Sequence, residues 1–221
     1  YIRHFLDSLE KQTYPHDKIQ FNILDNGSTD NTKGIIKNFG FRISDFGFAK
    51  FSFVESKENL GMWPGQEELL KHTDGEYVVA SAVDIILDKD FIKNAVEVME
   101  RDGKIGALQP KIYKFDLRGT SDVKVGTVVP TSQIDTCGFK IFRSRRVVNI
   151  GHGETDTGQY DNLGEIFAVE GAVPVFRKSA LESCRIPIQN SKFKIQNSKI
   201  ADSDFFWYGD DLDLAWRMRL F

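Results

Sequence analysis

The sequence predicts an α/β fold built on a mainly parallel, mixed sheet. Between residues 20 and 110, short apolar segments rich in β-branched or aromatic residues alternate with helix-like segments. The clearest example is EYVVASAVDIILDKDF at 76–91, where an apolar run from Tyr77 to Ala82 precedes a helical pattern that includes Met99 and has Asp88 as its expected N-cap. That order is typical of a buried parallel strand that leads into a helix.

The composition is that of a globular protein with a substantial core. The 221 residues include 41% hydrophobic and 28% charged residues. The net charge of −3 and the pI near 5.9 argue against a general nucleic-acid binder. No apolar run approaches the roughly 20 residues of a membrane span, and the first ten residues lack the features of a secretion signal. We therefore expect a cytoplasmic protein.

The cysteines and histidines do not predict a metal centre. Cys137 and Cys184 are far apart and belong to no CxxC motif, so free buried thiols are favoured over a disulfide. The four histidines are scattered along the chain, and none is assigned as a ligand.

The chain begins inside a helix. Ile2, Phe5, Leu6 and Leu9 form one helical face, and Pro15 ends the pattern. No strand precedes this helix, so we expect residues to be missing before Tyr1. A strand follows at Gln20–Leu24, and in the turn Asp25–Asp30 one of Ser28, Thr29 or Asp30 is expected to cap a helix that runs to Phe39.

The next segments continue the alternation. We expect a strand at Phe51–Glu55, a loop from Asn59 to Gly65, a helix at Gln66–His72 and a strand at Gly106–Pro110. After Lys111 the alternation stops. The later expectations are a strand at Ile134–Phe142, a glycine-rich loop at Gly151–Asp161, a strand within Phe167–Arg177 and a helix at Lys178–Ser183. The loop lacks the G-x-G-x-x-G spacing and the strand–helix frame of a dinucleotide site, so it is interpreted as a loop over a site.

A short duplication follows. IQNSKFK at Ile188–Lys194 is repeated as IQNSKI at Ile195–Ile200. Two copies do not make a solenoid, so a surface insertion is expected. Its lysines either contact anionic lipid or form a plain solvated loop. The chain then ends at Phe221 within a helical pattern, which again suggests a fragment.

Four segments, in this order, resemble the inverting glycosyltransferases of family 2, especially the rhamnosyltransferase-like members. The segments are SLEKQTYP at 8–15, DNGSTDNT at 25–32, GETDTGQYD at 153–161 with Glu170-Gly171-Ala172 and Arg177 beyond it, and FFWYGDDLDLAWR at 205–217. Together they cover nearly the whole chain, so their conjunction is more specific than any single motif.

The resemblance implies a GT-A fold, a three-layer α/β/α sandwich formed by residues 1–221 as a single catalytic domain. Residues 1–114 would form its Rossmann-like, nucleotide-sugar-binding half and residues 115–221 its acceptor-binding half. The missing opening strand would be the family's first strand.

Asp84 is the candidate metal ligand. Its position after the apolar run matches the family's metal-binding aspartate, which also holds the donor, and the implied cofactor is Mg²⁺ or Mn²⁺. Val83 departs from the family, where a further polar residue usually stands near this position. From the residues alone, Asp84 is equally a turn aspartate.

Asp211 is the candidate catalytic base, and Asp210 replaces the glutamate of the family's acid pair on the acceptor side. An ionised carboxylate at a helix start can take a proton from an acceptor hydroxyl. The structural alternative makes both residues caps on a surface face. For Asp213 that alternative is favoured, as an i,i+4 ion pair with Arg217.

The remaining candidates are assigned from position. Asp25 and Asn26 end a strand where the family's pair contacts the nucleotide, and an amide at Asn26 suits uracil or thymine. Gly171 and the aromatic pair Trp207–Tyr208 are placed on the acceptor side, where the aromatic pair either stacks on sugar or belongs to the core.

Two functions are kept open. The first is an inverting glycosyltransferase that moves a sugar from a dTDP-rhamnose or UDP-hexose donor to a glycan or lipid-linked acceptor in bacterial surface polysaccharide synthesis. Peripheral association with the inner face of the cell membrane is a further expectation for it. The second is a catalytically degenerate sugar-nucleotide-binding module. A nucleotidyltransferase ranks last, because its basic, glycine-rich phosphate loop is not found.

Overall fold

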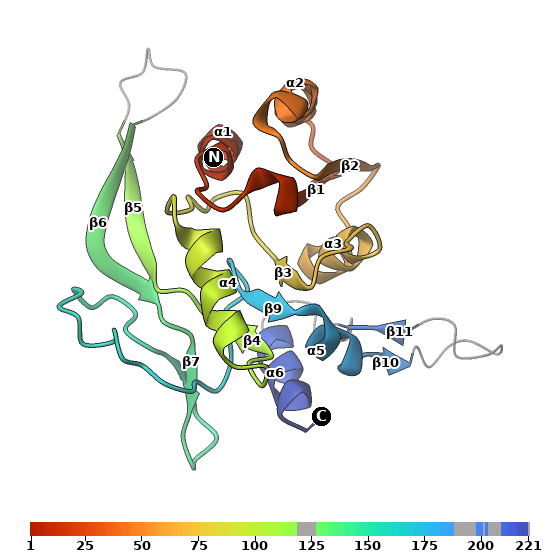
Figure 1. The fold of residues 1–221 in the computed structure, drawn as a ribbon. Coiled ribbons are helices and arrows are strands. Elements are labelled where there is room, and N and C mark those ends of the chain that lie inside the picture. The colour runs from red at the N-terminus through yellow and green to blue at the C-terminus, as the bar shows by residue number, and fades with distance from the viewer. Residues whose placement is uncertain (119–126, 188–197, 201, 203–208, 221) are drawn as a thin grey trace. The chain divides into compact units, whose positions relative to one another are not determined.

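The computed structural model describes residues 1–118, 127–187, 198–200, 202 and 209–220 (Figure 1). The chain forms two compact units. The first unit contains Tyr1–Leu108 and Gly171–Phe221, and the second contains Gln109–Glu170. The proposed division into a donor half and an acceptor half at residues 114 and 115 stays a prediction.

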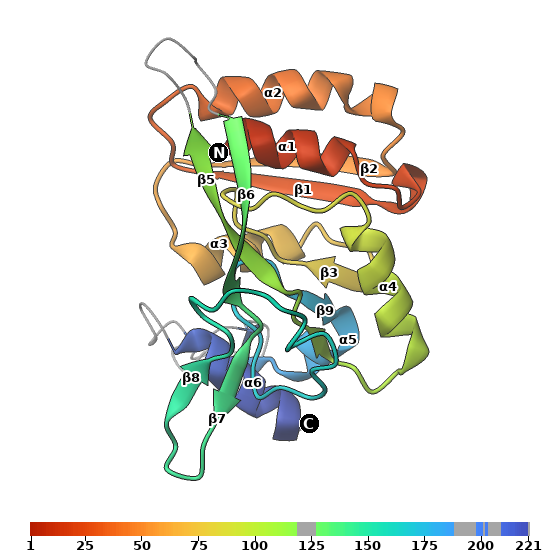
Figure 2. The same cartoon turned by 90° about the vertical axis from the view of Figure 1, so that its left-hand side faces the viewer.

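The first unit opens with helices on both faces of a parallel strand pair. Strands β1 and β2 pair from Gln20↔Lys50 to Asn26↔Ser56. Helices α1 and α2 lie on one side of this pair and α3 on the other (Figures 1 and 2). The bounds are α1 Ile2–Glu10, β1 Gln20–Asn26, α2 Thr32–Arg42, β2 Lys50–Ser56 and α3 Met62–Leu70, with 3₁₀ turns η1 His16–Lys18 and η2 Ile43–Phe46. This layering confirms the predicted α/β class.

The core between β1 and the first helices is aromatic. In β1 the buried residues alternate, and Phe21 and Ile23 point towards α1 and α2. The ring of Phe21 lies 6.3 Å from Phe5, 5.9 Å from Phe39 and 5.8 Å from Phe51, measured between centroids. The predicted apolar face of α1 is buried here, so the first prediction of a helix face is confirmed.

The strand expected to be parallel, β3 (Tyr77–Val79), is antiparallel to its neighbour in the structure. Strand β9 (Val175–Arg177) lies between β3 and β4 (Ala107–Leu108), and it is antiparallel to both. The apolar run from Tyr77 to Ala82 predicted a strand, and β3 forms within it. Its partner returns from far along the chain, and an apolar run does not encode that direction.

Helix α4 (Phe91–Arg101) begins later than expected. Its N-cap residue is Asp90, and the carboxylate of Asp88 instead accepts the backbone N–H of Asp90 at 2.9 Å. The predicted inner face is correct, because Ala95 and Met99 are buried with Val175 of β9.

Arg177 holds the end of α4 against β9. Its guanidinium donates to the carbonyl oxygens of Met99 at 2.8 Å and Ile105 at 3.1 Å, and it lies over the ring of Tyr77. An arginine at the carboxyl end of a helix pairs with carbonyls that have no partner in the helix. Arg177, part of the family resemblance, therefore has a structural role.

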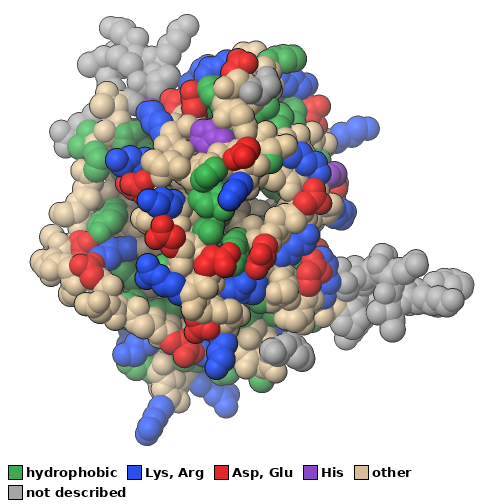
Figure 3. Space-filling model, viewed as in Figure 1, with side chains coloured by type: hydrophobic (Ala, Val, Ile, Leu, Met, Phe, Trp, Pro, Cys, Tyr) green, Lys and Arg blue, Asp and Glu red, His purple; other side chains and the backbone are tan. Residues whose placement is uncertain are grey.

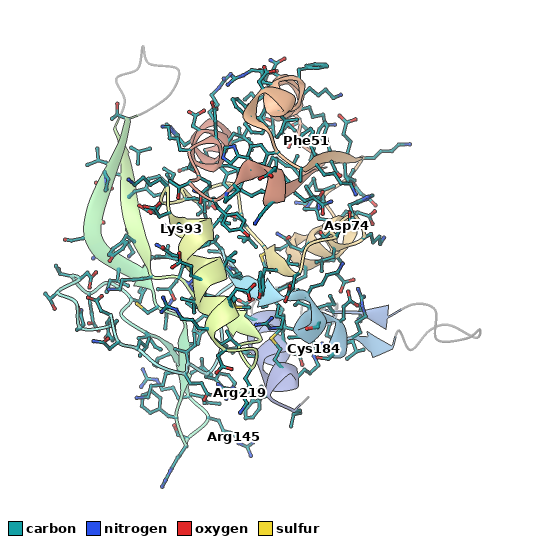
Figure 4. The ribbon with its side chains drawn as sticks, in the orientation of Figure 1. Phe51, Asp74, Lys93, Arg145, Cys184 and Arg219 are labelled. Carbon is teal, nitrogen blue, oxygen red and sulfur yellow. The ribbon has the colours of Figure 1, made fainter. Side chains whose placement is uncertain are left out.

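The last elements of the first unit are α5 (Lys178–Ser183), β10 (Ile186–Pro187), β11 (Ser198–Lys199) and α6 (Asp210–Leu220). Helix α5 has the predicted bounds. Strand β10 precedes the duplication and β11 lies within its second copy, and the two strands pair antiparallel. Most of the duplication lies outside the described residues. Cys184 follows α5 and is buried (Figure 4).

The second unit contains two hairpins. They are β5 (Ile112–Arg118) with β6 (Thr127–Thr136), and β7 (Phe139–Ile141) with β8 (Val147–Asn149). The expected single strand at Ile134–Phe142 is divided between β6 and β7 around Gly138. That glycine has a φ of 91°, and a side chain there would collide with Ile166.

The polar loop at Gly151–Asp161 is confirmed as irregular structure. It is held to the start of β5 by Lys111, whose Nζ lies 3.0 Å from Asp156 and 2.6 Å from Asp161. The hydroxyl of Tyr113 also donates to Asp156. Ion pairs of Lys111 with Asp156 and Asp161 therefore hold the loop to the start of β5.

Both cysteines are free and buried, as predicted, and they belong to different units. None of the helices in the described ranges has the length and apolar character of a membrane span. On the face seen in Figure 3, basic and acidic side chains are interspersed.

Candidate active site

Asp25 is buried at the carboxyl end of β1 with one oxygen unused. Its side chain is on the α2 side of the strand, where Oδ2 accepts the backbone N–H of Ser28 at 3.2 Å and lies 3.4 Å from Nζ of Lys33. The residue is 1% exposed, and its buried Oδ1 has no hydrogen-bond partner among the described residues. A buried acceptor of this kind is costly unless a donor reaches it.

The turn after β1 differs in detail from the expectation. Helix α2 starts at Thr32 after Asn31, and Asp30 accepts the backbone N–H of Thr32 at 3.0 Å. The hydroxyl and N–H of Thr32 lower the pKa of the Asp30 carboxyl. Gly27 has a φ of 81°, and a Cβ there would lie 2.8 Å from the backbone of Glu58. The sequence DNGSTD thus forms a tight turn that only glycine allows at its third position.

Asn26 points to the opposite side of the strand and is used within the chain. Its amide nitrogen donates to Oδ1 of Asn59 at 3.0 Å and to the carbonyl of Gly61 at 3.1 Å, and its oxygen accepts the N–H of Leu60 at 2.8 Å. The side chain therefore fixes the turn at 59–61, which leads into α3.

Asp84 lies just beyond a continuation of the β3–β9 pairing. The N–H of Ala80 donates to Pro174 at 3.1 Å, and the N–H of Ala82 donates to Ala172 at 2.9 Å. The same register places Val83 opposite Gly171. Asp84 is exposed, and within the described ranges its carboxylate contacts no hydrogen-bond or ion-pair partner. Its oxygens are therefore available to a ligand.

Gly171 lies directly against Asp211. A Cβ at position 171 would lie 3.1 Å from Oδ1 of Asp211 and 3.3 Å from Cε of Met62. Ala172 pairs with the segment that carries Asp84, and its neighbour Gly171 lies against the helix that carries Asp211. The assignment of the two carboxylates to one site stays a prediction. Met62, the first residue of α3, borders the same place.

Helix α6 presents its acidic first turn as predicted. Asp210, Asp211 and Asp213 all lie in that turn. Asp213 pairs with Arg217, Oδ2 to Nη2 at 2.6 Å, which confirms the structural interpretation of Asp213. Arg217 also donates to the carbonyl of Cys184 and so ties α6 to the end of α5. Trp207 and Tyr208 lie outside the described residues.

The described part of the chain supplies few ligands for a metal. Among the described residues, no three His, Cys, Asp or Glu side chains are grouped as a metal site. A single exposed carboxylate, Asp84, fits a Mg²⁺ or Mn²⁺ ion that takes most of its ligands from phosphates and water.

Sequence reasoning missed Met62 and the turn at 59–61. Asn59 and Gly61 are ordinary turn residues, and nothing in their pattern identifies Asn26 as their partner. Trp63, the residue after Met62, is 7% exposed and belongs to the core.

Comparisons with known proteins place the fold. A structure of the Pyrobaculum calidifontis mannosyltransferase PcManGT, in complex with GDP-Man and Mn²⁺, is 20% identical with a TM-score of 0.53, and the match covers 82% of this chain and 41% of that one. S. aureus TarS 1–349 in complex with UDP-GlcNAc is 16% identical with a TM-score of 0.55, covering 100% of this chain and 50% of that one. A search of curated protein sequences found no match.

These likenesses show the predicted GT-A fold, and the chain spans half or less of the length of both proteins. The sequence itself matches the family described as glycosyl transferase family 2 over residues 1–180, which is most of its length. The chain belongs to glycosyl transferase family 2.

Proposed function

We propose that the protein is an inverting, metal-dependent glycosyltransferase that moves a sugar from a nucleotide-diphosphate donor to a glycan or lipid-linked acceptor. One observation carries the proposal. The hydrogen bond from Ala82 to Ala172 extends the β3–β9 pairing to within two residues of Asp84, and Gly171, next to Ala172, lies against Asp211. The proposed donor-side and acceptor-side carboxylates thus belong to one compact unit, although they are far apart in the sequence.

Asp25 is the proposed contact to the nucleoside. Its buried Oδ1 lacks a donor, and an imino N–H of a base or a ribose hydroxyl would supply one. Asn26 was predicted to touch the base. Both of its N–H donors are used within the chain, so only its side-chain carbonyl oxygen can form a further hydrogen bond, as an acceptor. UDP and dTDP sugars therefore head the donors to be tested. Neighbours bound to UDP-GlcNAc and GDP-Man support a nucleotide-sugar donor in general.

Asp84 is the proposed metal ligand. A divalent cation held there with the donor's phosphates would neutralise the charge of the departing diphosphate. The exposed carboxylate suits this, since a hard cation shared with phosphates needs only one or two protein carboxylates.

Asp211 is the proposed base. Its carboxylate takes the proton of the acceptor hydroxyl as that oxygen forms a bond to the anomeric carbon. The bond from the anomeric carbon to the phosphate oxygen breaks, and the nucleoside diphosphate leaves with the electron pair. Attack opposite the leaving group inverts the anomeric configuration. Gly171 leaves room for the carboxylate, and Asp210, Trp207 and Tyr208 are proposed to border the acceptor.

The pathway is a finer proposal. The rhamnosyltransferase-like motifs favour dTDP-rhamnose as a donor and bacterial surface polysaccharide as the product, built at the inner face of the cell membrane. Residues 1–114 are proposed to bind the donor and residues 115–221 the acceptor.

The test is transfer by the purified protein with Mn²⁺ or Mg²⁺ and a panel of UDP-, GDP- and dTDP-sugars. Asp211→Asn should lower kcat by about 10²–10⁴-fold and leave nucleotide affinity unchanged, because the amide keeps the shape but accepts no proton. Asp88→Asn makes the same change ahead of α4 and should leave kcat unchanged. Wild-type transfer by Asp211→Asn would show that the base assignment is wrong.

A second function is favoured by Val83. This side chain is 45% exposed opposite Gly171, where a further polar ligand would otherwise strengthen the metal site. A degenerate module would bind UDP or dTDP in calorimetry, with or without Mn²⁺, and transfer no sugar from any donor. Turnover with Mn²⁺ that disappears on chelation excludes this alternative.

A further inference from the structure

The side chain of Asn26 is the centre of a small hydrogen-bonded turn. It makes three hydrogen bonds, of 2.8 to 3.1 Å, to Asn59, Leu60 and Gly61. Asn59 reinforces the turn by accepting the N–H of Gly61 at 2.9 Å. Both N–H donors of the amide are therefore committed to holding the turn.

The turn determines where α3 begins. Gly61 is the N-cap residue, with a φ of 90° that L side chains rarely adopt, and its carbonyl accepts the N–H of Gly65 as the first helical bond. A Cβ on Gly65 would lie 3.0 Å from Leu24 of β1, so the helix also packs closely on the strand. The first turn of α3 is therefore fixed at Gly61 by hydrogen bonds and at Gly65 by packing on Leu24.

Met62 connects the start of α3 with the surroundings of Asp211, the candidate base. It is the first residue of α3, it is 50% exposed, and its Cε lies 3.3 Å from the position of a Cβ on Gly171. The Asp211 carboxylate lies 3.1 Å from that same position. Met62 and Asp211 thus both lie next to the Gly171 hydrogen that a side chain would replace.

We infer that Asn26 is a positioning residue, which acts through the turn at 59–61 and Met62 to hold the Asp211 carboxylate in place. The inference rests on the proposed function for its kinetic consequence, and its structural part stands on the contacts alone. A base that shifts by a fraction of an ångström loses alignment with the acceptor, so the effect should fall on kcat rather than on donor affinity.

The test compares two identical substitutions in β1. Asn26→Asp removes both N–H donors and places a negative charge beside two oxygens. Asn22→Asp makes the same change earlier in the strand, where the amide donates to the Thr73 hydroxyl at 3.1 Å and to the His72 carbonyl at 3.4 Å rather than to the turn at 59–61. We expect Asn26→Asp to lower kcat by about tenfold or more with the donor KM changed less than about threefold, and Asn22→Asp to change neither.

Hydrogen exchange measures the link without turnover. In Asn26→Asp, peptides that cover residues 59–65 and 209–215 should exchange faster, whereas in Asn22→Asp only those around residue 73 should. Equal effects of the two variants on residues 209–215, or none from Asn26→Asp, would overturn the inference. If the wild type transfers no sugar but hydrogen exchange in the two variants is as expected, the result counts against the proposed function and not against the structural part of the inference.

A double variant tests the role of Met62. In Gly171→Ala the new methyl presses on both Met62 and Asp211, and Met62→Ala removes one of these contacts. We expect Met62→Ala to restore part of the kcat lost by Gly171→Ala, a coupling that independent sites do not show. Strictly additive losses would mean that Met62 does not position the base.

Discussion

Gly171 and Asp211 are in such close contact that a side chain at position 171 would press on the carboxylate. A Cβ there would lie 3.1 Å from Oδ1 and 3.4 Å from Oδ2 of Asp211. The backbone of Gly171 does not have a positive φ, so its conformation suits any residue. Glycine is therefore required here because Asp211 leaves little room for a side chain, and not because of the backbone conformation.

Gly171→Ala should impair transfer without unfolding the protein. The added methyl must displace Asp211 or Met62 by a few tenths of an ångström, and we expect kcat to fall about tenfold. The melting temperature should change little, because the substitution also lowers the entropy of the unfolded chain. Gly103→Ala is the matched control, since a Cβ there would have no atom within 4 Å. Equal kinetic effects of the two variants would contradict the prediction.

Arg217→Lys should loosen the helix that carries Asp211. Arg217 donates to Asp213 through Nε at 2.9 Å and Nη2 at 2.6 Å, and it also reaches the carbonyl of Cys184. Lysine keeps the charge but lacks the planar fork that makes these bonds together. We expect the free energy of unfolding to fall by about 1–2 kcal/mol in urea titration, and kcat to fall as well. Arg3→Lys, at an exposed position of α1, should change neither quantity.

The local elements could be predicted because each has its own signal. The face of α1, strands β1 and β2, the bounds of α5 and the acidic start of α6 follow from periodicity, propensity and capping residues. The family resemblance added the GT-A fold and the order of the candidate site residues. It also identified Gly171, whose contact with Asp211 no periodicity would suggest.

Relationships between distant segments could not be predicted. The direction of β9 beside β3 depends on how the chain returns after residue 170, and the partners of Asn26 are chosen by tertiary packing. Asn26 shows the difficulty best. An amide offers the same donors and acceptor to a nucleobase or to a turn, so its residue type alone predicts either use.

Asp156 makes the second unit sensitive to acid. Hydrogen bonds from the Tyr113 hydroxyl and the N–H of Gly158, together with Lys111, lower the pKa of Asp156 from 3.8 to about 2. A carboxyl whose pKa is lower in the folded state stabilises the fold above its unfolded pKa. That contribution is therefore complete above about pH 4 and is lost as the pH falls towards 2.

Asp156→Asn should remove this dependence. The variant should unfold at lower urea than the wild type at pH 7, and the two midpoints should converge as the pH approaches 2. Asp116→Asn makes the same change at an exposed position of β5 and should follow the wild type throughout. A constant difference between Asp156→Asn and the wild type at every pH would show that charge is not the cause.

Deleting one copy of the duplicated heptapeptide should leave the fold intact. Strands β10 and β11 pair as Ile186↔Lys199 and Pro187↔Ser198, so removal of residues 188–194 keeps both strands and leaves residues 195–197 to join them. Three residues are enough for a hairpin connection. Ile200 is fully buried and its N–H donates to Glu67 of α3, so the anchor beyond the hairpin also remains. We expect the melting temperature to change by less than about 2 °C, whereas Ile200→Ala should cost about 2–5 kcal/mol. A deletion as damaging as Ile200→Ala would mean that the first copy belongs to the core rather than to a surface insertion.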